Sequence, residues 1–139
     1  MINQLSSDAR IISIEGDKES ADIARVVHQF AGVEDRISIV NEFTDKAIPK
    51  LKELFNVDSF DFIFIDHYKD VYLRDFKLLE EHNLIQSGTM IVADNVITPG
   101  APDYLQYIRG NANYTSKQYD GKIEYRDDVP DAVEVSVRL

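Results

Sequence analysis

The sequence contains no cysteine, which excludes both a disulfide framework and a thiolate site. No apolar run approaches the roughly 18 residues that a membrane-spanning helix needs. The N-terminal stretch, Met1 to Leu5, lacks the basic and apolar blocks of a secretory signal. The 139 residues are enough for one domain with a core of its own. Together these features predict a cytoplasmic protein with a single domain over residues 1–139 and no membrane segment.

Positive charge is also scarce in this chain. The 25 acidic side chains outnumber the 15 basic ones, which gives a formal net charge of −10. Because nucleic acids are polyanions, this balance argues against a nucleic-acid-binding surface, and it favours a neutral or cationic small substrate no better than chance. We also expect the chain to be a monomer.

Short apolar runs alternate with amphipathic stretches along most of the chain. Runs rich in β-branched and aromatic residues predict strands, and apolar residues at helical spacing predict helices. The predicted strands are 10–14, 36–40, 60–65 and, after a turn at Ser87-Gly88, 89–93. The predicted helices are 18–31, 43–55 with Pro49 in its first turns, 72–82, and a short one capped by Asp103 that ends at 108.

After these elements, the segments 114–119, 122–125 and 133–139 look like strands of an antiparallel hairpin. Strand–helix units joined by right-handed crossovers form a doubly wound sheet. The predicted fold class is therefore α/β, with a mostly parallel sheet and a C-terminal antiparallel hairpin.

Two of the predicted strands end abruptly at polar residues. The apolar run 60–65 stops at Asp66, and the run 89–93 stops at Asp94 and Asn95. Ligands of open α/β sheets bind beyond the carboxyl ends of the strands, so we expect these three side chains to converge there. Carboxylate and amide oxygens suit Mg²⁺, which keeps further positions for water or substrate. A lone acid at a strand end is usually a turn or capping residue, and it is the pair of strand ends that favours a metal site.

The chain has no glycine-rich turn between a strand and a helix of the kind that binds dinucleotides. Glu15 nevertheless ends the strand that presents an acid to ribose hydroxyls in nucleotide-binding folds. That acid normally follows the glycine-rich turn by about 20 residues, a position that would precede Met1. The chain therefore looks as though it starts late.

Several short motifs, in one order from Ala9 to the C-terminus, resemble those of catechol O-methyltransferases. They are Ile14-Glu15, Phe30-Ala31-Gly32, Asp66-His67-Tyr68-Lys69-Asp70, Ala93-Asp94-Asn95-Val96-Ile97-Thr98-Pro99-Gly100, Pro102-Asp103 and Ile123-Glu124-Tyr125. The resemblance implies the Rossmann-like fold of S-adenosylmethionine-dependent methyltransferases. The first strand of that fold and its glycine-rich turn are absent from this sequence. The resemblance also implies an incomplete domain and Mg²⁺-dependent methyl transfer from S-adenosylmethionine to a catechol hydroxyl.

The resemblance further implies roles for individual residues. Asp66, Asp94 and Asn95 hold the metal, and Lys69 is the general base. The residues at the cofactor are Glu15 at the ribose, Gly16, Thr44 near the adenine, Asp66, His67 and Tyr68, which stacks on the adenine. The residues at the catechol are Lys69, Asn95, Pro99 as an apolar wall, and Glu124 as acceptor from the second hydroxyl.

The chemistry of the residues agrees with these roles. A divalent cation makes a bound hydroxyl more acidic, and the same cation disfavours the ammonium form of a nearby lysine such as Lys69. Holding the nucleophile in line with the sulfonium supplies most of the remaining acceleration. Alone, Lys69 would be an ordinary surface charge and His67 a turn residue, so we assign His67 no chemistry. Glu124 would be polar in any alternating strand.

Some positions depart from the resembled pattern. Thr44-Asp45 replaces the usual Ser-Gln, so a negative charge stands where an amide would face adenine. Gly16 replaces a bulkier apolar residue, and Tyr68 stands where tryptophan is common, so both changes predict a looser grip on the cofactor.

Two alternatives remain open at this point. One is a catalytically inactive protein of this fold that serves in binding or assembly. The joint presence of five candidate site residues argues against it: Asp66, Lys69, Asp94, Asn95 and Glu124. The other is a related metal-dependent methyltransferase acting on another vicinal diol or phenol.

Overall fold

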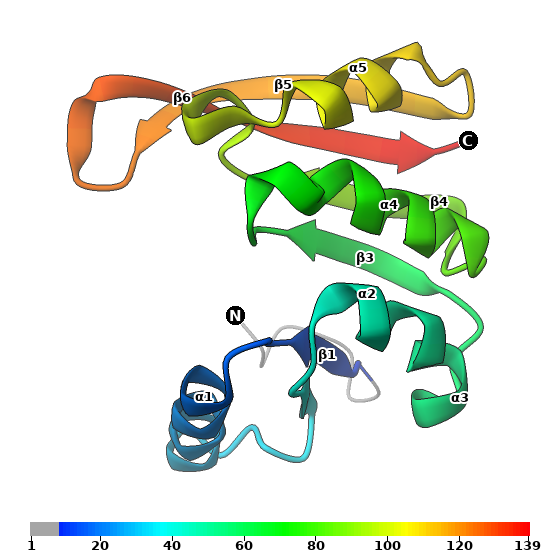
Figure 1. Cartoon of the computed structure of the whole chain (residues 1–139), viewed down its shortest axis with the longest axis vertical. Coiled ribbons are helices and arrows are strands. Elements are labelled where there is room, and N and C mark those ends of the chain that lie inside the picture. The colour runs from blue at the N-terminus through cyan, green and yellow to red at the C-terminus, as the bar shows by residue number, and fades with distance from the viewer. Residues whose placement is uncertain (1–8) are drawn as a thin grey trace. The chain divides into compact units, whose positions relative to one another are not determined.

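The computed structural model describes residues 9–139. These residues form two compact units, of which the first ends at Lys50 and the second is Leu51–Leu139. Figure 1 shows the helices and strands of both units. The prediction of one domain over the whole chain stays a prediction. No helix among the described residues is long and apolar enough to cross a membrane.

The first unit is built on two parallel strands. β1 (Ile11–Ile14) pairs with β2 (Ile37–Val40) in the register Ile11 to Ile37. Between them lies α1 (Lys18–Phe30), which begins at Asp17 because its carboxylate accepts a hydrogen bond from the Ser20 amide at 2.7 Å. The unit ends with α2 (Thr44–Ala47) and the short 3₁₀ turn η2 (Ile48–Lys50).

The second unit contains a four-stranded sheet in the order β3-β4-β6-β5. After α3 (Leu51–Phe55), β3 (Phe60–Ile65) pairs in parallel with β4 (Ile85–Ala93). β4 pairs antiparallel with β6 (Arg126–Arg138), and β6 pairs antiparallel with β5 (Tyr114–Ile123). The parallel pairs and the C-terminal hairpin confirm the predicted α/β class.

Two helices cover one face of this sheet (Figure 1). The short turn η3 (Lys69–Val71) leads into α4 (Tyr72–Glu81), and the irregular turn η4 (Val96–Gly100) leads into α5 (Pro102–Gly110). Aromatic side chains of α4, α5 and β5 pack edge-to-face, with the ring centre of Phe76 in α4 lying 5.5 Å from those of both Tyr104 in α5 and Tyr114 in β5. With Ile65, Ile91 and Ala93 from the strands, these rings form the buried core beneath η3 and η4.

Most predicted elements lie within a few residues of the observed ones, but several predicted bounds and one predicted cap are wrong. The helix expected over 43–55 is broken into α2, η2 and α3, because Pro49 lacks the amide proton that a continuous helix needs. Asp103 does not cap α5, since the residue before the helix is Ala101 and Pro102 takes its first position.

The other errors concern strands. The strand expected over 133–139 is β6, which begins at Arg126 because its first residues pair with the end of β5. β4 starts at Ile85 and runs through the expected turn, where Gly88 adopts φ of +89° and the pairing with β3 shifts register. β5 continues to Ile123, so the segment 122–125 is not a separate strand but includes the turn of the hairpin at Glu124 and Tyr125.

Candidate active site

Lys69 is the centre of a polar cluster at the carboxyl ends of β3 and β4. Its Nζ lies 3.0 Å from Oδ1 of Asp66, the residue that follows β3. It also lies 3.1 Å from Oδ1 of Asn95, which follows β4 by two positions. The Lys69 side chain is only 12 % exposed, so the ammonium group depends on these oxygens rather than on water. One cation thus holds oxygens from two neighbouring strand ends.

Tyr72 supports Lys69 from the first turn of α4. Its hydroxyl lies 2.5 Å from the Lys69 Nζ, which donates to it, and the ammonium also lies 4.7 Å from the centre of the ring. The Tyr72 hydroxyl in turn donates to the backbone carbonyl oxygens of Ile65, at 3.0 Å, and Asp94, at 3.1 Å. Tyr72 therefore links Lys69 to the ends of both strands.

Asp94 lies beside this cluster. Its amide donates to the Ile65 carbonyl at 3.0 Å, which continues the pairing of β4 with β3 by one residue. Its Oδ1 accepts a hydrogen bond from the backbone N–H of Asn95 at 2.7 Å. Burial first, and then the negative charges of Asp66 and Asp94, raise the pKa of the Tyr72 hydroxyl. Asp94 therefore belongs to the same cluster as Tyr72, whose hydroxyl donates to its backbone carbonyl.

Asn95 has a second partner on the far side of its amide. Its Nδ2 donates to Oδ2 of Asp131 in β6 at 2.7 Å, and Asp131 is 5 % exposed. Asn95 also has a φ of +52°, a left-handed conformation that asparagine tolerates better than most residues. Burial alone would raise the pKa of Asp131, but hydrogen bonds from Asn95, Thr98, Ala132 and Ile97 outweigh it and hold the pKa below its usual value.

The donor set of this cluster fits a hard divalent cation. Asp66 and Asn95 both turn an oxygen toward one positive charge, and Asp94 adds a second carboxylate at the neighbouring strand end. Three oxygen donors with room for water or substrate suit Mg²⁺. Among residues 9–139 no group of three or more His, Cys, Asp or Glu side chains is arranged for a metal, and this set contains only two carboxylates beside its amide.

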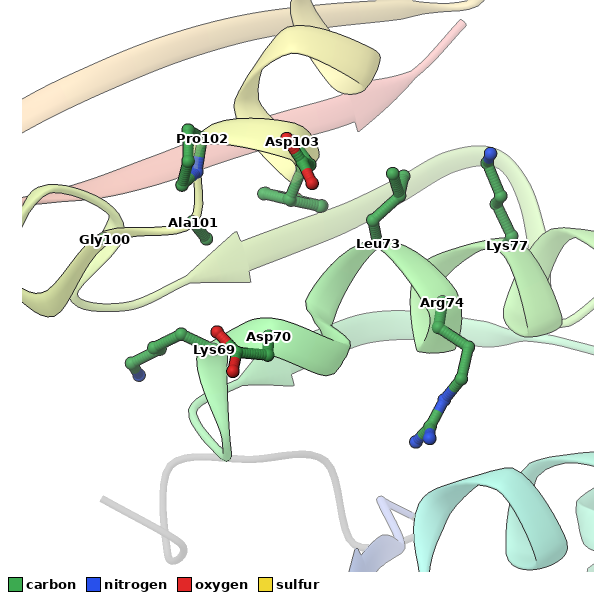
Figure 2. Close-up of a pocket in the computed structure, with 10 residues that line it drawn as sticks. Lys69, Asp70, Leu73, Arg74, Lys77, Gly100, Ala101, Pro102 and Asp103 are labelled. Atoms are coloured by element: carbon green, nitrogen blue, oxygen red, sulfur yellow. The ribbon is translucent and has the colours of Figure 1, made fainter.

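A groove of about 400 Å³ opens next to Lys69, between α4 and the start of α5. Figure 2 shows Lys69 at one end of it, with its side chain directed away from that of Lys77. The other two basic side chains that line the groove have partners of their own, since Arg74 pairs with Asp75 at 2.7 Å and Lys77 lies 5.0 Å from the Tyr107 ring centre. Lys69 is bonded to Asp66 and Asn95, so none of the three is a free cation for an anion in the groove.

The predicted cofactor residues of the first unit lie where β1 and β2 end. Asn41 donates to the Glu15 carbonyl at 2.9 Å, and Oε1 of Glu15 accepts from the Asp17 amide at 2.8 Å. A methyl group added at Gly16 would lie 2.8 Å from the ring of Phe43, so this ring fills the space of the missing side chain. Thr44 is the first residue of α2, directly after Phe43.

The remaining predicted residues differ in their surroundings. Nε2 of His67 lies 2.7 Å from Oδ2 of buried Asp75, which gives His67 a structural partner. Tyr68 is 70 % exposed, and a hydrogen bond with Asp70 raises its pKa. Pro99 is exposed within η4. Glu124 is exposed in the turn of the β5–β6 hairpin, and no hydrogen bond or ion pair among the described residues joins it to the Lys69 cluster.

The structure thus brings Asp66, Lys69, Asp94 and Asn95 together, and their proposed roles remain predictions. Two residues of the cluster, Tyr72 and Asp131, were not predicted from the sequence. Tyr72 follows Lys69 at helical spacing, a signal that could have been noticed. Asp131 is 36 residues from Asn95 and carries no local signal.

Comparisons with known proteins identify the class to which this arrangement belongs. The family model described as "O-methyltransferase" matches residues 1–105, and the chain belongs to this family. It is 43 % identical over 135 residues to catechol O-methyltransferase B of Danio rerio, covering 97 % of this chain and 51 % of that protein. It is 42 % identical over 125 residues to catechol O-methyltransferase of Sus scrofa, covering 90 % of this chain and 67 % of that protein.

The relatives confirm the resemblance to catechol O-methyltransferases, and the chain spans about half the length of most curated relatives that it matches. The fold is that of a solved O-methyltransferase from Bacillus cereus in complex with SAH. That structure matches with a TM-score of 0.84 at 23 % identity, over 97 % of this chain and 65 % of the other. The predicted methyltransferase fold is therefore confirmed.

Proposed function

We propose that this chain provides the metal-binding and catechol-binding part of an O-methyltransferase that methylates a catechol hydroxyl with S-adenosylmethionine and Mg²⁺. The observation that carries the proposal is the position of the Lys69 Nζ, 3.0 Å from Asp66 and 3.1 Å from Asn95. This position supports the proposal because the residue that we propose as base lies beside two of the proposed metal ligands, within a chain related to catechol O-methyltransferases.

In this proposal Asp66, Asp94 and Asn95 hold the metal. Mg²⁺ bound there supplies a positive charge that makes a catechol hydroxyl beside it more acidic. Lys69, in its neutral form, accepts the proton of that hydroxyl at Nζ. Tyr72 keeps Nζ beside the substrate, because its own hydroxyl is fixed by the carbonyls of Ile65 and Asp94.

The remaining roles concern the two small molecules. Glu15 binds the ribose of S-adenosylmethionine, with Gly16, Thr44, His67 and Tyr68 at the same cofactor. Pro99 forms the apolar wall beside the catechol ring, and Glu124 accepts from the second hydroxyl.

Calorimetry of catechol binding tests this proposal. We expect the chain to bind catechol in the presence of Mg²⁺ and to lose this binding when the metal is chelated. Asp94→Ala should abolish catechol binding. It should also abolish any transfer of a labelled methyl group that the unaltered chain catalyses. Asp58→Ala removes the same charge from an exposed residue before β3, at the end of that strand opposite Asp66, and should change neither. Catechol binding that survives chelation and Asp94→Ala would refute the proposal.

A further inference from the structure

Asp131 is a buried carboxylate to which the proposed function gives no role. Both of its oxygens are used. Oδ2 accepts from Nδ2 of Asn95 at 2.7 Å, and Oδ1 accepts from the backbone amides of Thr98 at 3.0 Å and Ile97 at 3.3 Å. The Thr98 hydroxyl adds a bond to the neighbouring Pro130 carbonyl at 2.8 Å. Pro130 and Asp131 of β6 thus bond to three residues of the segment that follows β4, namely Asn95, Ile97 and Thr98.

The bond to Asn95 decides which way its amide faces. An asparagine amide has an oxygen on one side and an NH₂ group on the other, and only the hydrogen-bond partners distinguish the two orientations. Here the NH₂ side meets a carboxylate, which can only accept, while the oxygen side meets the Lys69 ammonium, which can only donate. Turning the amide over would place the NH₂ group against the ammonium and the oxygen against the carboxylate.

We propose that Asp131 is a positioning residue that fixes the Asn95 amide with its oxygen toward the cation site formed with Asp66 and Asp94. This inference rests on the proposed function, because it assumes that Asn95 is a metal ligand. Groups that orient a ligand in this way typically change metal affinity by about 10- to 100-fold when they are replaced.

Asp131→Asn is the sharpest replacement, because it keeps the shape of the side chain. The side-chain NH₂ group of Asn95 bonds one oxygen of residue 131, and the backbone amides of Ile97 and Thr98 bond the other. A carboxamide has one oxygen, and when this oxygen accepts from the two backbone amides, the NH₂ group of residue 131 faces that of Asn95. The Asn95 side chain then loses the partner that sets its orientation.

The first test is calorimetric titration of the 139-residue chain with Mg²⁺ alone. We expect Asp131→Asn to weaken binding by about 10- to 100-fold. Asp128→Asn, which removes an exposed acid of the same strand, should leave the affinity unchanged. Unchanged affinity in Asp131→Asn would overturn the role of Asp131, whereas an unaltered chain that does not bind Mg²⁺ would overturn the proposed function.

A second comparison separates positioning from a loss of charge or of stability. Asn95→Gly removes the amide and tolerates the positive φ at this position. If Asp131 acts through Asn95, adding Asp131→Asn to Asn95→Gly should not weaken Mg²⁺ binding further. An equal additional loss in this background would show that Asp131 acts through its charge or through the fold.

A third measurement needs no replacement of Asp131 and no metal. The side-chain NH₂ signal of Asn95 can be assigned by nuclear magnetic resonance from its absence in Asn95→Gly. We expect one of its protons to exchange slowly with water in the unaltered chain, because it is bonded to a buried carboxylate. Exchange as fast as in the denatured chain would overturn the proposal, even if Asp131→Asn failed to fold.

Discussion

The Nζ of Lys69 and Oδ1 of Asn95 lie 3.1 Å apart, although the two residues are 26 positions apart in the sequence. The contact exists because β3 and β4 are parallel and end side by side, so that η3 and η4 start from the same edge of the sheet. It makes Lys69 a competitor for the oxygens that the proposed metal would use.

This competition predicts the effect of Lys69→Met on metal binding. The ammonium holds Asp66 and Asn95 at hydrogen-bond distance, and a second cation brought to the same oxygens is repelled by it. We expect Lys69→Met to bind Mg²⁺ several-fold more tightly than the unaltered chain in a calorimetric titration. Lys77→Met, whose ammonium lies over Tyr107, should have no effect. Weaker binding in Lys69→Met would mean that Lys69 and the metal do not share ligands.

A second prediction concerns the hydroxyl of Tyr72. Tyr72→Phe removes a buried group that bonds Lys69, Ile65 and Asp94. We expect the free energy of unfolding to fall by about 1 kcal/mol, the usual contribution of such a hydrogen bond, in urea titrations followed by circular dichroism. Tyr125→Phe is the matched control, since Tyr125 is 99 % exposed. An equal effect of the two substitutions would contradict the bonding described for Tyr72.

A third prediction concerns the ion pair between Arg109 and Glu134. Both carboxylate oxygens of Glu134, which is 1 % exposed, accept from the guanidinium at 2.8 and 2.6 Å. Arg109→Ala would leave a buried charge without its partner, which we expect to lower the free energy of unfolding by about 1–3 kcal/mol. The lower end applies if water replaces the half-exposed guanidinium.

The control for this pair is Arg126→Ala. Arg126 and Asp128 form an exposed pair near the hairpin turn, and such pairs are screened by water and salt. Their loss should leave the unfolding midpoint unchanged. Equal destabilisation by both substitutions would contradict the structural role of the Glu134 pair.

A fourth prediction concerns alkaline pH. Burial raises the pKa of both Tyr104 and Tyr114, reinforced by the charge of Glu134 near Tyr104 and by a hydrogen bond to Glu80 at Tyr114. A raised folded-state pKa contributes stability that is complete below the unfolded value of about 10 and is lost as the pH rises above it. We therefore expect the chain to unfold on alkaline titration.

Tyrosinate absorbance measures this directly. The native chain should ionise fewer tyrosines than the urea-denatured chain at the same pH, until a cooperative loss of circular dichroism releases the remainder. Superimposed titration curves for the native and denatured chains would contradict the burial of these two hydroxyls.

Local patterns in the sequence were sufficient to predict most of the elements. The run 60–65 is confirmed with both of its ends, and the abrupt change from Ile65 to Asp66 and from Ala93 to Asp94 located the edge of the sheet where the polar cluster lies. Where periodicity was the only guide, it missed interruptions. Pro49 breaks the helix expected over 43–55, and Gly88 allows β4 to continue through an expected turn.

The supporting residues of the cluster could not be predicted in this way. Asp131 reads as an ordinary loop acid after Pro130, and only the pairing of β6 with β4 brings it to Asn95. The hairpin shows the opposite case. Glu124 lies in an alternating segment that resembles a functional motif, yet the observed turn places it among exposed residues, and its role as a catechol acceptor stays a prediction.

The most direct test of the whole account is a crystal structure of this chain grown with Mn²⁺, whose anomalous scattering locates the metal without assumptions about the site. Mn²⁺ shares the preference of Mg²⁺ for octahedral oxygen ligands. We predict one strong peak about 2.0–2.2 Å from oxygens of Asp66, Asp94 and Asn95, with the Lys69 ammonium displaced from it. A peak elsewhere, or carboxylates of Asp66 and Asp94 that turn away from each other with no metal between them, would contradict the account.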